Sequence, residues 1–305
     1  MIDGATLEAL ADAGCVVTPG RPLAKLAYWR VGGPAEAWVE VSTLDQLVAV
    51  QASGLAVTVL GNGSNALIHD DGISGLVVRL VGELAGLRID GQAARVGAGL
   101  RLNVLLARLD RAGLAGGEPF AGIPGTLGGA VVMNAGSLLG ETAELVTAVT
   151  VVLAGGEVLT LDPDDLGFAY RHAVLPPGAV VAHADLVFTD QDVPARRARR
   201  QAFLARRKAT QPLDKPSCGS TFTNPPGDHA ARLIDVSGLK GTRRGGAEIS
   251  EKHANFIVNL GGATAEDIRW LIAHARVTVR EQHGVWLTPE VRLLGDWPPD
   301  ALERP

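Results

Sequence analysis

Cys218 and Ser220 stand two residues apart, with Gly219 between them, in the stretch PSCGSTFTNP. Either side chain would be a nucleophile if a general base lay beside it. The stretch contains no G-x-S-x-G turn of the kind that exposes a hydrolase serine. The seven histidines of the chain show neither a pairing with Cys218 nor the H-E-x-x-H spacing of a metal site. The residue types therefore leave open whether this segment attacks a substrate or does other chemistry.

Three charged residues are further candidates. Arg171 follows Tyr170 in AYRHAVL, and an arginine can hold a carboxylate through two parallel hydrogen bonds, although a surface ion pair is the alternative. Glu290 lies in the apolar run LTPEVRLL. Partial burial raises the pKa of a carboxyl group, which suits an acid, whereas an outward-facing strand residue is the alternative. Lys208, at the end of a basic segment, is a candidate to bind an anionic ligand.

Glycine makes up 38 of the 305 residues, about one in eight against a typical ~7%. The glycines gather in loops such as LGNGSN (60–65) and GIPGTLGGAVVMNAG (122–136). Glycine stands where the backbone needs positive φ or where another group approaches closely. A loop with one fixed proline and several glycines can wrap a pyrophosphate and offer it backbone N–H groups. These loops predict a large ligand held mainly by main-chain groups.

The first of these loops also fits G-x-G-x-x-A after a strand, the pattern of a dinucleotide-binding turn. The residues that follow, LIHDDGISG, do not begin the helix that such a fold requires. A phosphate loop outside a dinucleotide fold is therefore favoured, with a plain tight turn as the alternative. The second loop lacks the G-K-[ST] of a nucleotide P-loop, and a buried structural loop is its alternative.

Short strands and a few helices must position these residues. Gly155 and Gly156 separate two β-rich runs and predict a hairpin. Thr264 and Asp267 resemble a capping box at the start of a long helix that Gly284 ends. The basic segment 192–210 is expected to be a helix with a solvated face, a nucleic-acid arm being the alternative. We expect further strands at 37–41, 57–60, 76–80 and 287–295, helices at about 44–51 and 101–112, and a frayed tail after 296.

The totals bound the class of protein. A chain of 305 residues, 47% hydrophobic and 20% charged, is an ordinary globular protein of two or three domains. The formal charge of −5 argues against a general nucleic-acid binder, and no run approaches the ~18 apolar residues of a membrane helix. The N-terminus does not resemble a signal peptide, so Cys15 and Cys218 are expected to be free thiols in a reducing cytoplasm.

Six ordered blocks together resemble the UDP-N-acetylenolpyruvoylglucosamine reductase family, which acts in bacterial peptidoglycan precursor synthesis. The resemblance runs over about residues 22–295, and six blocks in order are far more specific than one glycine loop. The blocks are LGNGSNALIHDDGISGLVVRL, FAGIPGTLGGAVVMNAGS, YRHAVL, PSCGSTFTNPPGDHAARLID, GLKGTRRGGAEISEKHANFIVN and HGVWLTPEVRLLG.

The resemblance implies an α+β fold. A two-part FAD-binding module of the vanillyl-alcohol-oxidase type would occupy residues 1–82 and 83–200, and a C-terminal α/β substrate-binding domain 201–296, before a tail at 297–305. NADPH would reduce the non-covalently bound FAD and leave. UDP-N-acetylglucosamine enolpyruvate would then take a hydride from flavin N5 at C3 and a proton at C2, giving UDP-N-acetylmuramate. The resemblance further implies a cytoplasmic monomer that neither binds nucleic acid nor inserts into a membrane.

The family's site residues carry over position by position. Ser220 matches the catalytic serine that donates the proton to C2. Arg171 and Glu290 match the residues that hold the substrate carboxylate and stabilise the enolate-like intermediate, and Tyr170, Lys208 and Asn224 match groups at the substrate. The positions that match the FAD contacts are Asn62, Gly63, Ser64, Asn65, Ile123, Pro124, Gly125, Thr126, Gly128, Gly129, Asn134 and Gly136.

The chain departs from the family pattern at two points. Leu138 and Leu139 stand where members often carry a tyrosine after Asn-Ala-Gly, and Ala173 replaces a common serine after Tyr-Arg. Neither change touches the three catalytic positions, and the compact C-terminal part resembles the shorter subtype. Two alternatives stay open: an FAD-dependent oxidase of another substrate, and a flavin-binding module without catalysis.

Overall fold

The computed structural model describes residues 2–305, which form two compact units. Unit 1 holds the N-terminal residues up to Pro19, together with Glu36–Asn62 and Gly75–Ala205. Unit 2 holds Gly20–Ala35, Gly63–Ser74 and Arg206–Pro305. The two short segments of unit 2 were expected in the first FAD-binding part, yet they group with the C-terminal third of the chain. A division drawn along the sequence could not reveal this, because each segment pairs with residues about 200 positions away.

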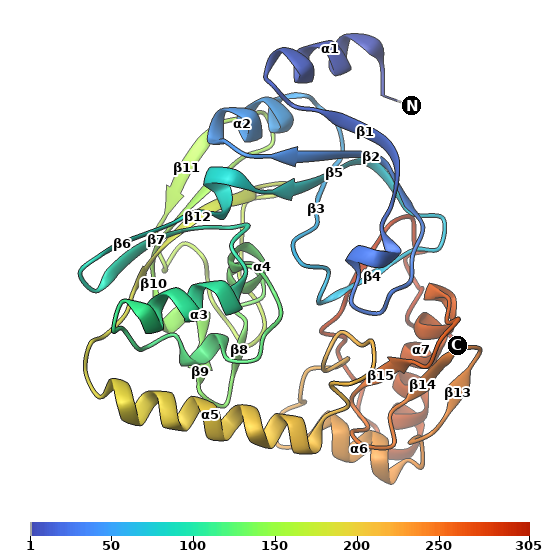
Figure 1. The fold of residues 1–305 in the computed structure, drawn as a ribbon. Coiled ribbons are helices and arrows are strands. Elements are labelled where there is room, and N and C mark those ends of the chain that lie inside the picture. Colours follow the sequence, from blue (N-terminus) through green and yellow to red (C-terminus); the bar gives the residue numbers. More distant parts are fainter. Residues whose placement is uncertain (1) are drawn as a thin grey trace. The chain divides into compact units, whose positions relative to one another are not determined.

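Two sheets contain most of the strands up to residue 187 (Figure 1). The neighbouring strands β3 and β5 run parallel, whereas all neighbours in the five-stranded sheet are antiparallel. The four-stranded sheet has the order β1 (Val17–Pro22), β2 (Pro34–Val41), β5 (Ile73–Leu80) and β3 (Val57–Val59). The five-stranded sheet has the order β11 (Val158–Leu161), β10 (Val146–Val152), β12 (Val180–Val187), β7 (Ala93–Gly97) and β6 (Leu87–Asp90).

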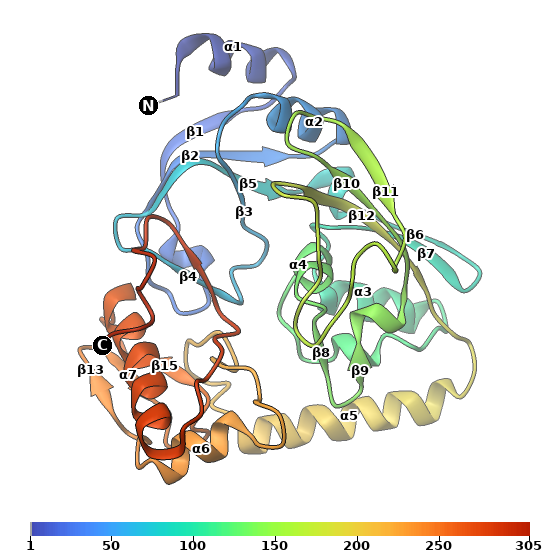
Figure 2. The same ribbon diagram turned by 180° about the vertical axis from the view of Figure 1, so that it is seen from behind.

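Helices and short turns complete unit 1. Thr43 caps α2, since its hydroxyl accepts from Gln46 N at 3.2 Å. Helix α4 contacts β12 and β7 (Figure 2). The α-helices are α1 (Gly4–Asp12), α2 (Leu44–Ala52), α3 (Leu102–Arg111) and α4 (Leu127–Val132). A two-stranded hairpin, β8 (Gly136–Ser137) with β9 (Gly140–Glu141), and the 3-10 helices η2 (Gly82–Ala85), η3 (Glu118–Phe120) and η4 (Thr142–Glu144) make up the rest.

The expected hairpin is present as β10 and β11, and both turn glycines have positive φ, 101° at Gly155 and 93° at Gly156. Alternate residues of β10 point into the core, where Val149 and Val151 are fully buried. The first glycine loop is followed by the strand β4 (Ala66–Ile68) and not by a helix. The loop is therefore not the dinucleotide-binding turn of a Rossmann fold, which requires a helix at this point.

The basic segment forms α5 (Val193–Thr210), which carries the chain from unit 1 into unit 2. Three of its arginines pair with acids of unit 1. Arg197 and Arg200 share Asp110 at 3.0 and 2.5 Å, and Arg196 contacts Glu118 at 3.2 Å. Because these arginines are paired with acids, fewer of the positive charges of α5 are available to bind a nucleic acid than the sequence indicated.

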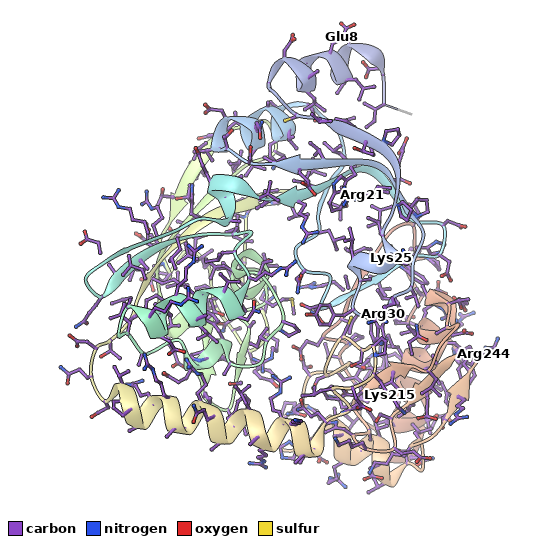
Figure 3. The ribbon with its side chains drawn as sticks, in the orientation of Figure 1. Glu8, Arg21, Lys25, Arg30, Lys215 and Arg244 are labelled. Carbon is purple, nitrogen blue, oxygen red and sulfur yellow. The ribbon has the colours of Figure 1, made fainter. Side chains whose placement is uncertain are left out.

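Unit 2 packs helix α7 (Ala265–His283) against small sheets. The capping box of Thr264 and Asp267 is formed, and Gly284 ends α7 with φ 69°. Trp29 is fully buried and joins unit 2, because its indole N–H donates to Ile257 O at 2.7 Å. The same 20–35 segment exposes Lys25 and Arg30 (Figure 3). The remaining elements are η1 (Ala24–Leu26), α6 (Ala230–Val236), the sheet β13 (Arg243–Arg244), β14 (Ala247–Ile249) and β15 (Ile257–Asn259), and β16 (Arg292–Leu294) parallel to β4.

Two expectations for the chain end need correction. The strand expected over 287–295 is regular only at Arg292–Leu294. The tail is docked on α7, not frayed: Arg269 donates to Ala301 O at 2.5 Å, and Arg276 donates to Leu302 O at 2.5 Å. Both arginines donate to backbone carbonyls of the tail, and contacts of this kind leave no pattern in the sequence. Within residues 2–305, no helix combines the length and apolarity needed to cross a bilayer.

Candidate active site

Ser220 and Glu290 are 70 positions apart in the sequence but lie on two paired segments of unit 2. Glu290 N donates to Thr221 O at 2.9 Å, and Thr223 N donates to Thr288 O at 3.0 Å. Phe222 and Pro289 form the antiparallel bridge between these two bonds. Glu290 is therefore opposite the residue that follows Ser220, and both side chains are half-buried.

The segment that carries Ser220 is held firmly on its far side by Asn255. The Asn255 side chain accepts from Phe222 N at 2.9 Å and donates to Phe222 O at 2.8 Å, while its carbonyl accepts from Thr221 N at 2.8 Å. The Phe222 ring is only 2% exposed within the core of unit 2. Packing and three hydrogen bonds thus fix the backbone directly after Ser220.

Cys218 is excluded as a nucleophile by its surroundings. Its thiol is buried and directed at two carbonyls, with Sγ 3.7 Å from Ala66 O and 3.9 Å from Gly63 O. Burial raises the pKa of this thiol to about 12, so the reactive thiolate is scarce near neutral pH. Cys218 therefore packs beside the loop, and Ser220 is the residue of the pair that remains available for chemistry.

One residue of the first glycine loop lies directly beside Glu290. Asn65 Nδ2 donates to Glu290 O at 2.9 Å, and Asn65 O accepts from Arg292 N at 3.0 Å. Gly63 lies so close to Leu26 that a Cβ would be 2.3 Å from the Leu26 carbonyl oxygen. Gly63, Ser64 and Asn65 thus belong to unit 2, whereas Asn62 belongs to unit 1.

Arg171 lies in unit 1, on a two-residue turn. Ala169 and His172 exchange both backbone hydrogen bonds, at 2.9 and 3.0 Å, and leave Tyr170 and Arg171 at the tip. The Arg171 guanidinium donates to Gly136 O at 2.9 Å and contacts Glu141 at 3.4 Å. It also stacks over the Tyr170 ring, 4.8 Å from the ring centre.

The second glycine loop crosses residues 98–102 in unit 1. Leu127 N and Gly128 N donate to the carbonyls of Leu100 and Ala98 at 2.9 and 2.8 Å. Asn62 joins this loop from the other side, where its Nδ2 donates to Pro124 O at 2.5 Å. Part of the first loop is thereby attached to the second within one compact unit.

Comparisons with known proteins decide the family. A family model described as "UDP-N-acetylenolpyruvoylglucosamine reductase, C-terminal domain" matches residues 211–294, and one described as "FAD binding domain" matches residues 35–162. The UDP-N-acetylenolpyruvoylglucosamine reductase of Anaeromyxobacter dehalogenans strain 2CP-C is 47% identical over 285 residues, or 92% of this chain and 86% of that protein. That of Myxococcus xanthus strain DK1622 is 45% identical and covers 97% of this chain and 100% of the relative. The chain belongs to the UDP-N-acetylenolpyruvoylglucosamine reductase family.

A solved member of this reductase family agrees in structure. The UDP-N-acetylenolpyruvylglucosamine reductase of Thermus caldophilus superposes with a TM-score of 0.80 at 40% identity, covering 92% of this chain and 98% of that one. The expected fold, an α+β FAD-binding module followed by a C-terminal domain, is confirmed by this match together with the two family models.

The second glycine loop has donors that fit the FAD of a reductase. Leu127 N and Gly128 N are taken by the protein itself, but among residues 2–305 no acceptor faces the N–H groups of Thr126 and Gly129. The space at Gly129 is open, since the nearest atom to an added Cβ would be Thr126 Oγ1 at 3.8 Å. The amide of the exposed Gly129, beside open space, suits an anionic oxygen acceptor such as a phosphate.

Other residues matched to the reductase family are also engaged within the protein. Asn224 Oδ1 accepts from Ala230 N at 3.1 Å, at the start of α6. Lys208 is exposed on α5, and its carbonyl accepts from Lys252 Nζ at 3.0 Å. Asn134 is 1% exposed, and its side chain bonds Glu141, Ala169 and Ala143 inside unit 1.

Sequence reasoning missed Glu141 and Asn255. Glu141 contacts the Arg171 guanidinium, and Asn255 holds the backbone beside Ser220. Both act through hydrogen bonds to residues 30 or more positions away, for which the sequence offers no periodic signal. For Asn255, the one available signal was an amide within the apolar run HANFIVN, because a buried amide must find partners.

Proposed function

We propose that this chain is an FAD-dependent oxidoreductase that reduces UDP-N-acetylenolpyruvoylglucosamine to UDP-N-acetylmuramate, with NADPH as the source of electrons. Family membership supports the substrate and the cofactor. The observation that supports the site most directly is the backbone pairing that sets Glu290 opposite Thr221, one residue from Ser220. Asn65, from a proposed FAD loop, is bonded to the same Glu290 segment at 2.9 Å.

In this reaction, bound FAD supplies the hydride that C3 of the substrate receives. The protein's part is to hold the substrate and to manage the charge and the proton. Arg171 binds the substrate carboxylate, and Glu290 stabilises the enolate-like species that forms at the adjacent C2. Groups that meet charge as it grows in the transition state contribute most to the rate.

Ser220 donates the proton that C2 takes up. A serine hydroxyl is a weak acid, but a carbanion is basic enough to accept its proton, and solvent can resupply it because Ser220 is half-buried rather than enclosed. Neither a base nor a thiolate is required, which agrees with the protonated, buried state of Cys218.

The other matched residues serve binding. Tyr170, which is 51% exposed beside Arg171, together with Lys208 and the Nδ2 of Asn224, contacts the UDP-sugar. The amides of Thr126 and Gly129 bind FAD phosphate oxygens, with the remaining glycine-loop residues around them. The enzyme works as a monomer in the cytoplasm: one chain contains all three catalytic residues, and both cysteines are free and buried, as expected in a reducing compartment.

The test is a colour cycle on the purified protein, combined with Ser220→Ala. The wild type should be yellow, bleach with NADPH without oxygen, and regain colour when UDP-N-acetylglucosamine enolpyruvate is added. In Ser220→Ala, bleaching should continue at nearly the wild-type rate, while the return of colour should slow by ~10²-fold or more.

Three outcomes would each contradict part of the proposal. A well-folded protein that takes up no FAD would exclude both the proposed reductase and an FAD-dependent oxidase of another substrate. Bleaching without reoxidation by this substrate would favour an oxidase of another substrate or a non-catalytic module. Equal slowing of both half-reactions in Ser220→Ala would show that Ser220 supports the fold and is not the proton donor.

A further inference from the structure

Arg171 has an unusual backbone for a residue that must bind a substrate. Its φ is 59°, in the left-handed region that non-glycine residues seldom occupy. Within residues 2–305 only four non-glycine residues have positive φ: Arg30, Asn134, Arg171 and Asp192. Such conformations persist where the surrounding structure holds them, and they gather at functional sites.

Asn134, a second member of that group, is joined directly to the Arg171 turn. Its φ is 38°, and its Nδ2 donates both to Ala169 O at 3.0 Å and to Glu141 Oε2 at 2.9 Å. Its Oδ1 accepts from Ala143 N at 3.0 Å. One buried amide therefore ties the turn that carries Arg171 to the acid that contacts the Arg171 guanidinium.

Glu141 completes the arrangement from the β8–β9 hairpin. Its Oε1 lies 3.4 Å from Arg171 NH1, while Gly136 O, in the paired strand, accepts from Arg171 NH2 at 2.9 Å. The guanidinium is thus contacted at both terminal nitrogens, and the Arg171 side chain is only 15% exposed. Contacts at two points of a planar group fix its orientation as well as its position.

We propose that Asn134 and Glu141 are positioning residues, which orient the Arg171 guanidinium for the substrate carboxylate. This inference rests on the proposed function of Arg171. Asn134 holds the strained turn, and Glu141 holds the head group. A misplacement of about 1 Å at such a group can cost ~10²-fold in rate, so the effect on catalysis is large even though neither residue touches the substrate.

Glu141→Gln is the sharpest single change. The Glu141 carboxylate accepts from Arg171 NH1 and Asn134 Nδ2, and also from the backbone N–H of Glu144 in a capping box. A glutamine has one acceptor oxygen and presents an NH₂ donor at the other position, so at least one of the bonds to Arg171 and Asn134 is lost while the side-chain shape is kept. Asn134→Gly is a second variant, because glycine tolerates the φ of 38° but removes the amide.

Glu144→Gln is the matched control. Glu144 lies in η4, directly after the hairpin, and its carboxylate bonds the backbone N–H of Glu141 at 2.9 Å, whereas the Glu141 carboxylate contacts the Arg171 guanidinium. A merely structural role for this loop predicts the same kinetic loss in both glutamine variants.

The experiment measures both half-reactions of the holoenzyme. In Glu141→Gln and Asn134→Gly, kcat/KM for UDP-N-acetylglucosamine enolpyruvate should fall about 10- to 100-fold, and in Glu141→Gln flavin bleaching by NADPH should change by less than about twofold. Glu144→Gln should stay within about twofold of the wild type in both. Equal loss in the Glu141 and Glu144 variants, or loss of both half-reactions together, would overturn the proposal.

A double-mutant cycle with Arg171→Lys separates this inference from the proposed function. If Glu141 acts through Arg171, Glu141→Gln added to Arg171→Lys should reduce kcat/KM by less than about a further twofold. Additive losses would overturn the positioning role alone. Full substrate reduction by Arg171→Lys and Arg171→Ala would instead remove Arg171 from the proposed function.

Discussion

Cys218 and Ser220 lie on either side of Gly219, and they differ in their availability for chemistry because their neighbours differ. Cys218 is 7% exposed and faces carbonyls, whereas Ser220 lies half-buried beside the Glu290 segment. The sequence stretch identified both as candidates but could not separate them, because the difference comes from Ala66 and Glu290, at distant positions. The resemblance did separate them, and it did so from aligned motifs, not from the local chemistry.

The thiols give a residue-scale prediction. With a pKa of about 12, only about one Cys218 in ten thousand is a thiolate at pH 8, and the thiol is also buried. Burial raises the pKa of Cys15 as well. In the native protein at pH 8, iodoacetamide should leave both cysteines unmodified over an hour, and in urea both should react, as followed by intact mass. Rapid labelling of Cys218 in the native protein would contradict the packing role assigned to it.

Elements with local signals were predictable, and elements that depend on distant partners were not. The β10–β11 hairpin and both ends of α7 follow from glycine, threonine and aspartate at fixed offsets. The segment 287–295 is a regular strand only at Arg292–Leu294, which pairs with β4, whereas residues 288–290 make an isolated bridge with residues 221–223. The N-terminus of α7 is also held by Asp70, whose oxygens accept from Ala265 N at 2.8 Å and Glu266 N at 3.0 Å.

This contact of Asp70 gives an element-scale prediction. A carboxylate that bonds two first-turn amides satisfies unpaired donors and opposes the positive end of the helix dipole. Asp70→Ala should therefore lower the free energy of unfolding by about 0.5–2 kcal/mol in urea denaturation. Asp71→Ala is the control, because the neighbouring side chain is 97% exposed and should change stability by less than about 0.5 kcal/mol. Similar losses in both variants would show that α7 does not depend on this cap.

On the scale of the whole molecule, the LGNGSN motif is divided between the two units. Asn62 and Gly63 are adjacent in LGNGSN, yet they belong to different units. A sequence motif records order along the chain, and nothing in its residues marks where the chain leaves one core for another. The three proposed catalytic positions are divided likewise, with Arg171 in unit 1 and Ser220 and Glu290 in unit 2.

Partly buried histidines make the stability of the molecule depend on pH. Burial lowers the pKa of His183, His253 and His274 in the folded protein. The unfolded chain binds protons at these residues near pH 6.5 while the folded chain does not, so stability falls as pH drops below about 7. In His183→Gln, the loss of unfolding free energy between pH 7.5 and 5.5 should be smaller than in the wild type.

The control for this prediction is His229→Gln, at an exposed position. In urea denaturation, the free energy of unfolding of this variant should change between pH 7.5 and 5.5 by as much as that of the wild type. The prediction is wrong if His183→Gln retains the full pH dependence, since another group would then carry it.

The five crossings between the two units have a consequence for how the protein is made. Residues 20–35 and 63–74 emerge early from the ribosome, but their partners in unit 2 begin only at Arg206. β4 waits longest, because its parallel partner β16 spans Arg292–Leu294. Trp29 and Leu67, both fully buried in the folded chain, stay exposed to solvent or to chaperones until their partners in unit 2 emerge. Unit 2 therefore cannot close before β16 has left the ribosome, and a nascent chain that stalls before Leu294 still lacks it.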